Sequence, residues 1–253
     1  MSDTAEDAVP APTAPTGPIP ETFHPRMVAI AEVLLCSSVP TQLVIGALLG
    51  MAGLSLTTGN GQLSLPFVVT LSLTDTAVLI ALMVLILRSH GESARALWLG
   101  SRPIGWEVLR GLALVPVVVL MVGILLNGLR LFFPSLHNVQ TNPFEELAGT
   151  TAADAALLSF VAIFAGGLRE ELQRAFLLVR FERHLGGAAV GVVVINVVFG
   201  LLHAMQGRDA VIATGTLGLF WAILYLRRRS SVAPIVNHAG FNSMEILRIA
   251  IGP

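Results

Sequence analysis

The run GAAVGVVVINVVFGLLHAMQ, at residues 187–206, is apolar over almost its whole length and carries two strongly polar side chains, Asn196 and His203, before its final Gln206. A helix needs roughly 20 predominantly apolar residues to cross the hydrocarbon core of a bilayer, and the run reaches that length. Asn196, Phe199 and His203 are separated by three and four residues, so they share one face of a helix. We therefore predict a membrane helix with one polar stripe.

The composition of the whole chain supports the same class of protein. Of the 253 residues, 54% are hydrophobic and 12% are charged, and the mean hydropathy is +0.78. Soluble globular domains carry about 25% charged residues, so an ordinary soluble domain is excluded. We predict an all-α fold, a polytopic transmembrane helix bundle of about seven spans. The predicted spans are residues 28–54, 65–88, 106–132, 152–184, 187–206, 210–227 and 231–251.

The chain begins with a segment of a different character. Residues 1–26 are rich in Ala, Pro and Thr, and they lack the basic and apolar regions of a signal peptide. We predict a disordered N-terminal tail, followed by one transmembrane domain at residues 27–253. A single cysteine, Cys36, excludes an internal disulfide, and its apolar surroundings predict simple packing.

Arginine supplies all fifteen Lys and Arg residues, and it is distributed unevenly between the loops. Segments 88–110, 180–183 and 227–229 are rich in Arg, whereas segment 56–64 has none. Basic loops are retained in the cytoplasm, so we predict a cell-membrane protein with a cytoplasmic N-terminus and an external C-terminus. Segment 91–110 mixes Arg with Trp and Leu, which predicts a stretch lying on the cytoplasmic membrane surface.

Three polar clusters interrupt the later spans. Ionisable groups at membrane depth are costly and usually face a bundle interior or a water-filled cavity, so each cluster is a functional-site hypothesis. Together they supply two carboxylates, two imidazoles and an amide, the inventory that a hydrolase needs to activate water and stabilise an oxyanion. The clusters comprise Glu170, Glu171, Phe199, His203, His238 and Asn242.

Helix geometry predicts that these clusters meet. Glu171 and His203 both lie roughly 22–24 Å along their helices from the glycine turn at residues 186–187, so an antiparallel hairpin brings them to one level. The last span carries a second polar stripe, and we expect both stripes to face one cavity in the cytoplasmic half of the membrane. That second stripe comprises His238, Asn242 and Glu245.

At these motifs the chain resembles the CPBP family of intramembrane metalloproteases, which includes type II CAAX prenyl endopeptidases and bacteriocin-processing or self-immunity homologues. The family pattern is E-E-x-x-x-R, then F-x-x-x-H, then H-x-x-x-N or D. FGLLH at 199–203 and HAGFN at 238–242 fit the second and third motifs, and the resemblance covers about residues 90–250. The first motif reads EELQR at 170–174, one residue short, which leaves open which glutamate is the base.

The resemblance implies an intramembrane peptidase acting on membrane-associated chains, including prenylated CAAX-type substrates. A glutamate would activate water, His203 would orient this water or bind a metal, and His238 with Asn242 would stabilise the oxyanion. Arg174 would keep a carboxylate ionised. Two mechanisms remain open. Either Zn²⁺ is held by His203, His238 and Glu171 with one open position, or glutamate activates water without a metal.

Spacing suggests different roles for the two glutamates. Glu170 lies one helical turn before Arg174, so we predict that these two pair and that Glu171 is the freer base. The expected partners are the lipid bilayer and a membrane-associated peptide or protein, and no nucleic acid. The shortened motif also fits a weak or inactive family member acting as a membrane scaffold or bacteriocin self-immunity protein. A proton-coupled transporter is a third class, but no inverted repeat is visible.

Overall fold

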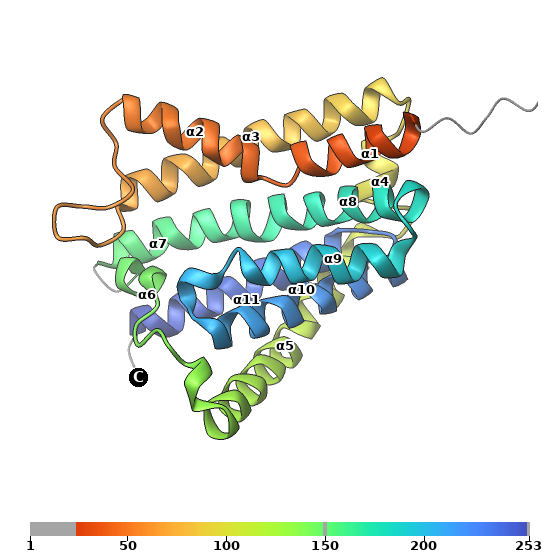
Figure 1. The fold of residues 1–253 in the computed structure, drawn as a ribbon. Helices are drawn as coiled ribbons and strands as arrows, with labels where there is room; N and C mark the ends of the chain where they lie inside the picture. The colour runs from red at the N-terminus through yellow and green to blue at the C-terminus, as the bar shows by residue number, and fades with distance from the viewer. Residues whose placement is uncertain (1–23, 149–150, 252–253) are drawn as a thin grey trace, which may run out of the picture.

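The computed structural model describes residues 24–148 and 151–251, and its regular elements in these ranges are all helices. The predicted all-α fold is confirmed, with α7 and α8 forming a long helix through the middle of the bundle (Figure 1). The predicted tail, residues 1–26, lies outside the described residues except for its last three, which begin α1. The helices are α1 His24–Leu35, α2 Val39–Met51, α3 Leu65–Ser89, α4 Ala94–Trp98, α5 Ile104–Phe132, α6 Pro143–Ala148, α7 Ala152–Val161, α8 Glu170–His184, α9 Ala188–Leu201, α10 Arg208–Arg228 and α11 Val232–Ile251, with 3₁₀ turns at Pro134–Leu136 and Ala204–Gln206 and a π-helix at Ala162–Arg169.

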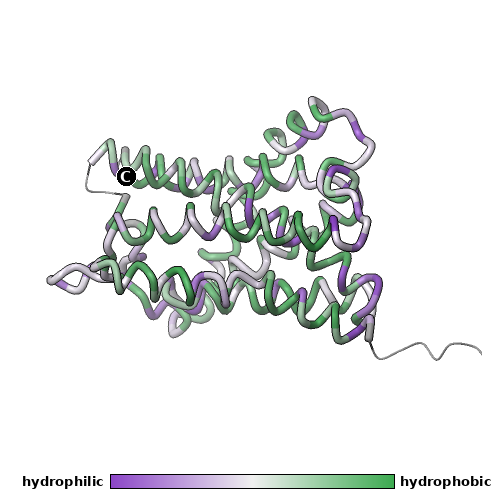
Figure 2. Tube along the Cα trace, turned by 90° about the horizontal axis from the view of Figure 1, so that it is seen from above, coloured by the Kyte–Doolittle hydropathy of each residue, from purple (hydrophilic) through white to green (hydrophobic). Residues whose placement is uncertain are grey.

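Five helical stretches in the described residues are long and apolar enough to cross a bilayer. The two other predicted spans are α9, which has only 14 residues, and α11, which has 20 residues but does not reach the same apolar level. The predicted count of seven is therefore approximate. Figure 2 shows long hydrophobic stretches along the helices, interrupted by a few hydrophilic residues within the bundle. The five stretches are Pro25–Met51, Leu65–Ser89, Ile104–Phe132, Ala152–His184 and Arg208–Arg228.

The first predicted span is broken into two helices, α1 and α2. Ser38 adopts a left-handed backbone conformation with φ 67°, and Pro40 stands in the first turn of α2, where its missing N–H leaves no hydrogen bond unmade. Gln173 of α8 stabilises the break, because its Nε2 donates to the carbonyl of Cys36 at 2.8 Å. The chain thus exchanges helical hydrogen bonds for contacts with the central helix.

The segment around α4 closes one end of the bundle. The indole of Trp98 is buried and donates to the carbonyl of Leu172 at 3.1 Å, and the amide of Ser231 donates to the carbonyl of Trp98 at 2.7 Å. Trp106, by contrast, is 69% exposed at the start of α5. The predicted surface segment 91–110 is therefore only partly superficial, because its first half packs against α8 and the start of α11.

Glycines allow α11 to approach its neighbours closely. A Cβ at Gly111 of α5 would lie 2.7 Å from Cβ of Val236 and 2.8 Å from the carbonyl oxygen of Ala233. A Cβ at Gly167 of the π-helix would lie 2.7 Å from Cβ of Ala239. These two contacts hold α11 between α5 and the central helix, and so fix the depth of its polar stripe.

We predict that Gly111→Ala destabilises the protein, because the added methyl meets the backbone of α11. Overpacking of this kind costs about 1–3 kcal/mol, so the melting temperature in detergent should fall. Gly123→Ala on the same helix is the matched control, because a Cβ there meets nothing within 4 Å. Equal melting temperatures for the two variants would contradict this close packing.

Candidate active site

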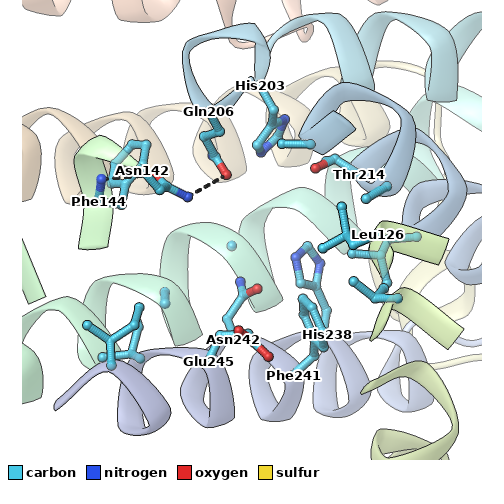
Figure 3. Close-up of a pocket in the computed structure, with 18 of the residues that line it drawn as sticks. Leu126, Asn142, Phe144, His203, Gln206, Thr214, His238, Phe241, Asn242 and Glu245 are labelled. Atoms are coloured by element: carbon cyan, nitrogen blue, oxygen red, sulfur yellow. Dashed lines mark hydrogen bonds between the residues drawn. The ribbon is translucent and has the colours of Figure 1, made fainter. Parts of the chain in front are cut away.

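A pocket of about 700 Å³ lies between α5, α7, the π-helix, α10 and α11, within the size range of small-molecule and peptide-binding sites. Its labelled polar side chains come from several helices and point toward one space (Figure 3). The pocket extends from His238 toward the end of the bundle opposite the Arg-rich end. The location of the site in the cytoplasmic half of the membrane stays a prediction. The predicted site residues that line it are Glu170, Phe199, His203, His238, Asn242 and Glu245.

The two glutamates point in different directions. Glu171 is only 2% exposed, and Nε of Arg174 lies 3.1 and 3.3 Å from its two carboxylate oxygens. Nδ1 of His238 lies 2.9 Å from Oε1 of Glu171. The predicted pairing of Glu170 with Arg174 is therefore wrong. The guanidinium turns back over the residue three positions earlier, and Glu170, about 100° around the helix, faces the pocket.

Arg174 is the centre of a buried polar cluster behind the pocket wall. Its Nη1 donates to Oδ1 of Asn196 at 2.8 Å, and its guanidinium lies 4.5 Å from the ring centroid of Phe199. Gly218 of α10 makes the space, because a Cβ there would lie 2.5 Å from Oδ1 of Asn196. Asn196, predicted to face the cavity with its stripe, instead binds Arg174.

Glu170 is held by a second arginine. Nη2 of Arg169 donates to its Oε1 at 3.1 Å, while Nη1 of Arg169 forms an ion pair with Asp75 of α3. Asp75 is fully buried and also accepts hydrogen bonds from Thr41 and Gln42 of α2. Sequence reasoning missed this relay. The available signal was one acidic residue, Asp75, and one basic residue, Arg169, on separate apolar helices. Charged side chains at membrane depth usually pair with a group of opposite charge.

The imidazole of His238 is held in one orientation. It stacks on Trp221 with ring centroids 3.6 Å apart and an interplanar angle of 15°, and the Trp221 indole donates to Asn237 at 2.8 Å. The carboxylate of Glu171 at Nδ1 requires the hydrogen there. The other ring nitrogen of His238, Nε2, then faces Glu170. It lies 3.9 Å from Oε2 of Glu170, which is too far for a direct hydrogen bond.

The π-helix Ala162–Arg169 ends directly before Glu170. Such segments are rare and occur frequently at functional sites. Within it, Gly166 leaves room for α11, because a Cβ there would lie 2.5 Å from Nδ2 of Asn242 and 3.9 Å from Nε2 of His238. The bare backbone at this position lets the amide and the imidazole border the same space as Glu170.

His203 reaches the pocket from the turn after α9, across from His238 (Figure 3). Its Nδ1 lies 2.7 Å from the carbonyl oxygen of Phe199, so Nδ1 carries the hydrogen and Nε2 is an acceptor. The Phe199 ring centroid is 4.8 Å from His203 and 6.4 Å from His238. The distance between the centroids of the two imidazole rings therefore cannot exceed the sum of these two distances.

The donor set expected for zinc does not fit this arrangement. Both oxygens of Glu171 are bound by Arg174, and Nδ1 of His238 is bound by Glu171, so these atoms do not converge with His203. In residues 24–148 and 151–251, no three His, Cys, Asp or Glu side chains are grouped so that they could hold one metal ion.

The fold and the pocket define a polytopic helical membrane protein with a cavity inside the bundle, whose largely apolar lining carries a few polar side chains. Residues 152–244 match the family model described as type II CAAX prenyl endopeptidase Rce1-like. This segment, which runs from α7 into α11 and includes Glu170, His203, His238 and Asn242, is thus similar to that family and supports the resemblance to CAAX proteases. The chain matches no curated protein and no solved structure.

We predict that the two glutamates differ in their effect on stability. Glu171→Gln leaves the buried Arg174 without a carboxylate, and breaking a buried pair typically costs about 3–5 kcal/mol. Glu170→Gln should cost much less, because Arg169 keeps Asp75. Melting temperatures in detergent measure both, with Glu182→Gln as a control at a half-exposed pair on the same helix. A larger loss in Glu170→Gln would contradict the assigned pairs.

Proposed function

We propose that the protein is an intramembrane endopeptidase that hydrolyses peptide bonds of membrane-associated substrates with a water activated by Glu170. The Rce1-like segment supports a CAAX-type protease role in general. One observation carries the choice of base. The Glu170 carboxylate borders the pocket and has one oxygen without an ion-pair partner within hydrogen-bonding distance in the described residues, whereas Arg174 and His238 occupy Glu171.

The gap between Glu170 and His238 suits a catalytic water. The atoms Oε2 of Glu170 and Nε2 of His238 are 3.9 Å apart, so one water can lie about 2.8 Å from both. Both atoms accept hydrogen bonds, and a water that donates to both turns its lone pairs toward the pocket. Glu170 then takes one proton as the water oxygen attacks the peptide carbonyl, and returns it to the leaving amine.

Asn242 and His203 supply the groups that bind the peptide. Nδ2 of Asn242, beside Gly166, is the proposed donor to the oxyanion, a contact that typically contributes ~10²–10³ in rate. Nε2 of His203 is the proposed acceptor for a peptide N–H across the pocket. Glu171 acts through His238, which it orients, and is a positioning residue. The proposal uses no metal, because Arg174 and Nδ1 of His238 already bind the carboxylate of Glu171.

The charge distribution supports a location in the cell membrane with the N-terminus in the cytoplasm. Arginines cluster at the end of the bundle where α1 begins, α3 ends and α10 ends, and retention of basic loops in the cytoplasm fixes orientation. The lipid bilayer and a membrane-associated peptide or protein are the proposed partners.

We predict that Glu170→Gln abolishes peptide hydrolysis without unfolding the protein. Loss of a general base typically costs 10²–10⁴-fold in rate, so kcat should fall by about that factor while KM stays near the wild-type value. The assay uses proteoliposomes, with a fluorogenic prenylated CAAX peptide and its unprenylated counterpart as probes. Glu182→Gln, on the same helix but at the Arg-rich end, is the matched control.

Full activity in Glu170→Gln together with an inactive but folded Glu171→Gln would reverse the assignment of the base. A wild-type protein that binds these peptides and cleaves neither would favour the non-catalytic scaffold or immunity role.

A further inference from the structure

The pocket is closed at one end of the bundle and open at the other. At its inner end His238 is 4% exposed and Trp221 is 1% exposed. Toward the other end its lining residues become exposed, through Asn127 and Gln140 to Arg248 in the last turn of α11. A chain that reaches Glu170 through this pocket must therefore enter from the end where α5 and α11 finish.

The opposite end is sealed by packing and hydrogen bonds. The segment between α3 and α5 crosses it, and a Cβ at Gly100 would lie 2.2 Å from the carbonyl oxygen of Arg229. Tyr225 donates to the carbonyl of Leu97 at 3.2 Å, and Ser231 is fully buried beneath this segment. At this end, the segments that connect helices in the described part of the chain contribute no residue to the lining of the pocket.

The sealed end is also the end with most of the arginines. Ten of the fifteen arginines lie at the sealed end. Of the remaining five, Arg169 and Arg174 lie inside the bundle, and three lie near the open end. The positive-inside rule counts Lys and Arg near the ends of spans, so it assigns the sealed end to the cytoplasm. The ten arginines of the sealed end are Arg26, Arg88, Arg95, Arg102, Arg110, Arg180, Arg183, Arg227, Arg228 and Arg229.

Combining the two observations, we propose that the pocket opens to the outer face of the membrane and receives peptide chains presented there. The substrate class is then an extended segment of an exported or externally anchored chain. The nature of the reaction in the pocket rests on the proposed function, whereas the side of entry rests on the packing and the charges.

The chemistry of the open end suits a peptide backbone. Asn142 and Gln206 lie across from each other there, and Nδ2 of Asn142 donates to Oε1 of Gln206 at 3.2 Å (Figure 3). Primary amides both donate and accept hydrogen bonds, as backbone amides do, and they are indifferent to side-chain charge. Leu126 and Ile246 add apolar wall, which fits a substrate that is itself anchored in lipid.

Labelling of single cysteines tests the side of entry without reference to activity. Cys36 is fully buried, so the wild-type chain serves as an unlabelled background. Gln140→Cys introduces a thiol at the exposed end of the pocket, and Ala96→Cys introduces an exposed thiol in α4 at the sealed end without removing an arginine. Cells expressing each full-length variant are treated with a membrane-impermeant maleimide before and after permeabilisation.

The proposal predicts that Gln140→Cys is labelled in intact cells and that Ala96→Cys is labelled only after permeabilisation. Labelling of Gln140→Cys only after permeabilisation, or at neither stage, would overturn it, as would labelling of Ala96→Cys in intact cells. Since the readout does not depend on hydrolysis, an inactive protein with the expected labelling would refute the proposed function and leave the side of entry standing.

Discussion

The buried guanidinium of Arg174 is the interaction on which the rest of the site depends. A charge at membrane depth persists only when neighbouring groups neutralise and hydrogen-bond it. Glu171 supplies the opposite charge, Asn196 of α9 supplies an acceptor, and Phe199 covers the guanidinium face. Glu171 in turn binds His238 of α11, so one ion pair fixes the relative positions of α8, α9 and α11.

A second ion pair explains why two adjacent glutamates can have different roles. Arg169 bridges Asp75 of α3 and Glu170, and Asp75 is anchored by α2, so the first part of the chain helps to hold the proposed base. Each glutamate thus has its own arginine. Glu171 is enclosed on all sides, while Glu170 keeps one edge in the pocket. Burial, and not the order of the residues in the motif, separates their chemistry.

The apolar runs were sufficient to predict an all-helical membrane bundle, because bilayer thickness dictates helix length. The stripes containing His203 and His238 were also readable, because helical periodicity is local. What the sequence did not reveal depends on long-range packing. The break stabilised by Gln173, the π-helix before Glu170 and the Asp75 relay all require knowledge of which helices are neighbours. The predicted ion pair between Glu170 and Arg174 was wrong for the same reason, because the partners of these side chains depend on which helices are neighbours.

The most direct measurement is an experimental structure of the Glu170→Gln protein with an uncleaved peptide bound. The account predicts that the scissile carbonyl lies in the pocket and faces the gap between the residue at 170 and Nε2 of His238, with its oxygen on the amide of Asn242, while Glu171 stays on Arg174. A peptide whose scissile bond faces Glu171, or a Glu171 side chain released from Arg174 and turned into the pocket, would contradict the central claim.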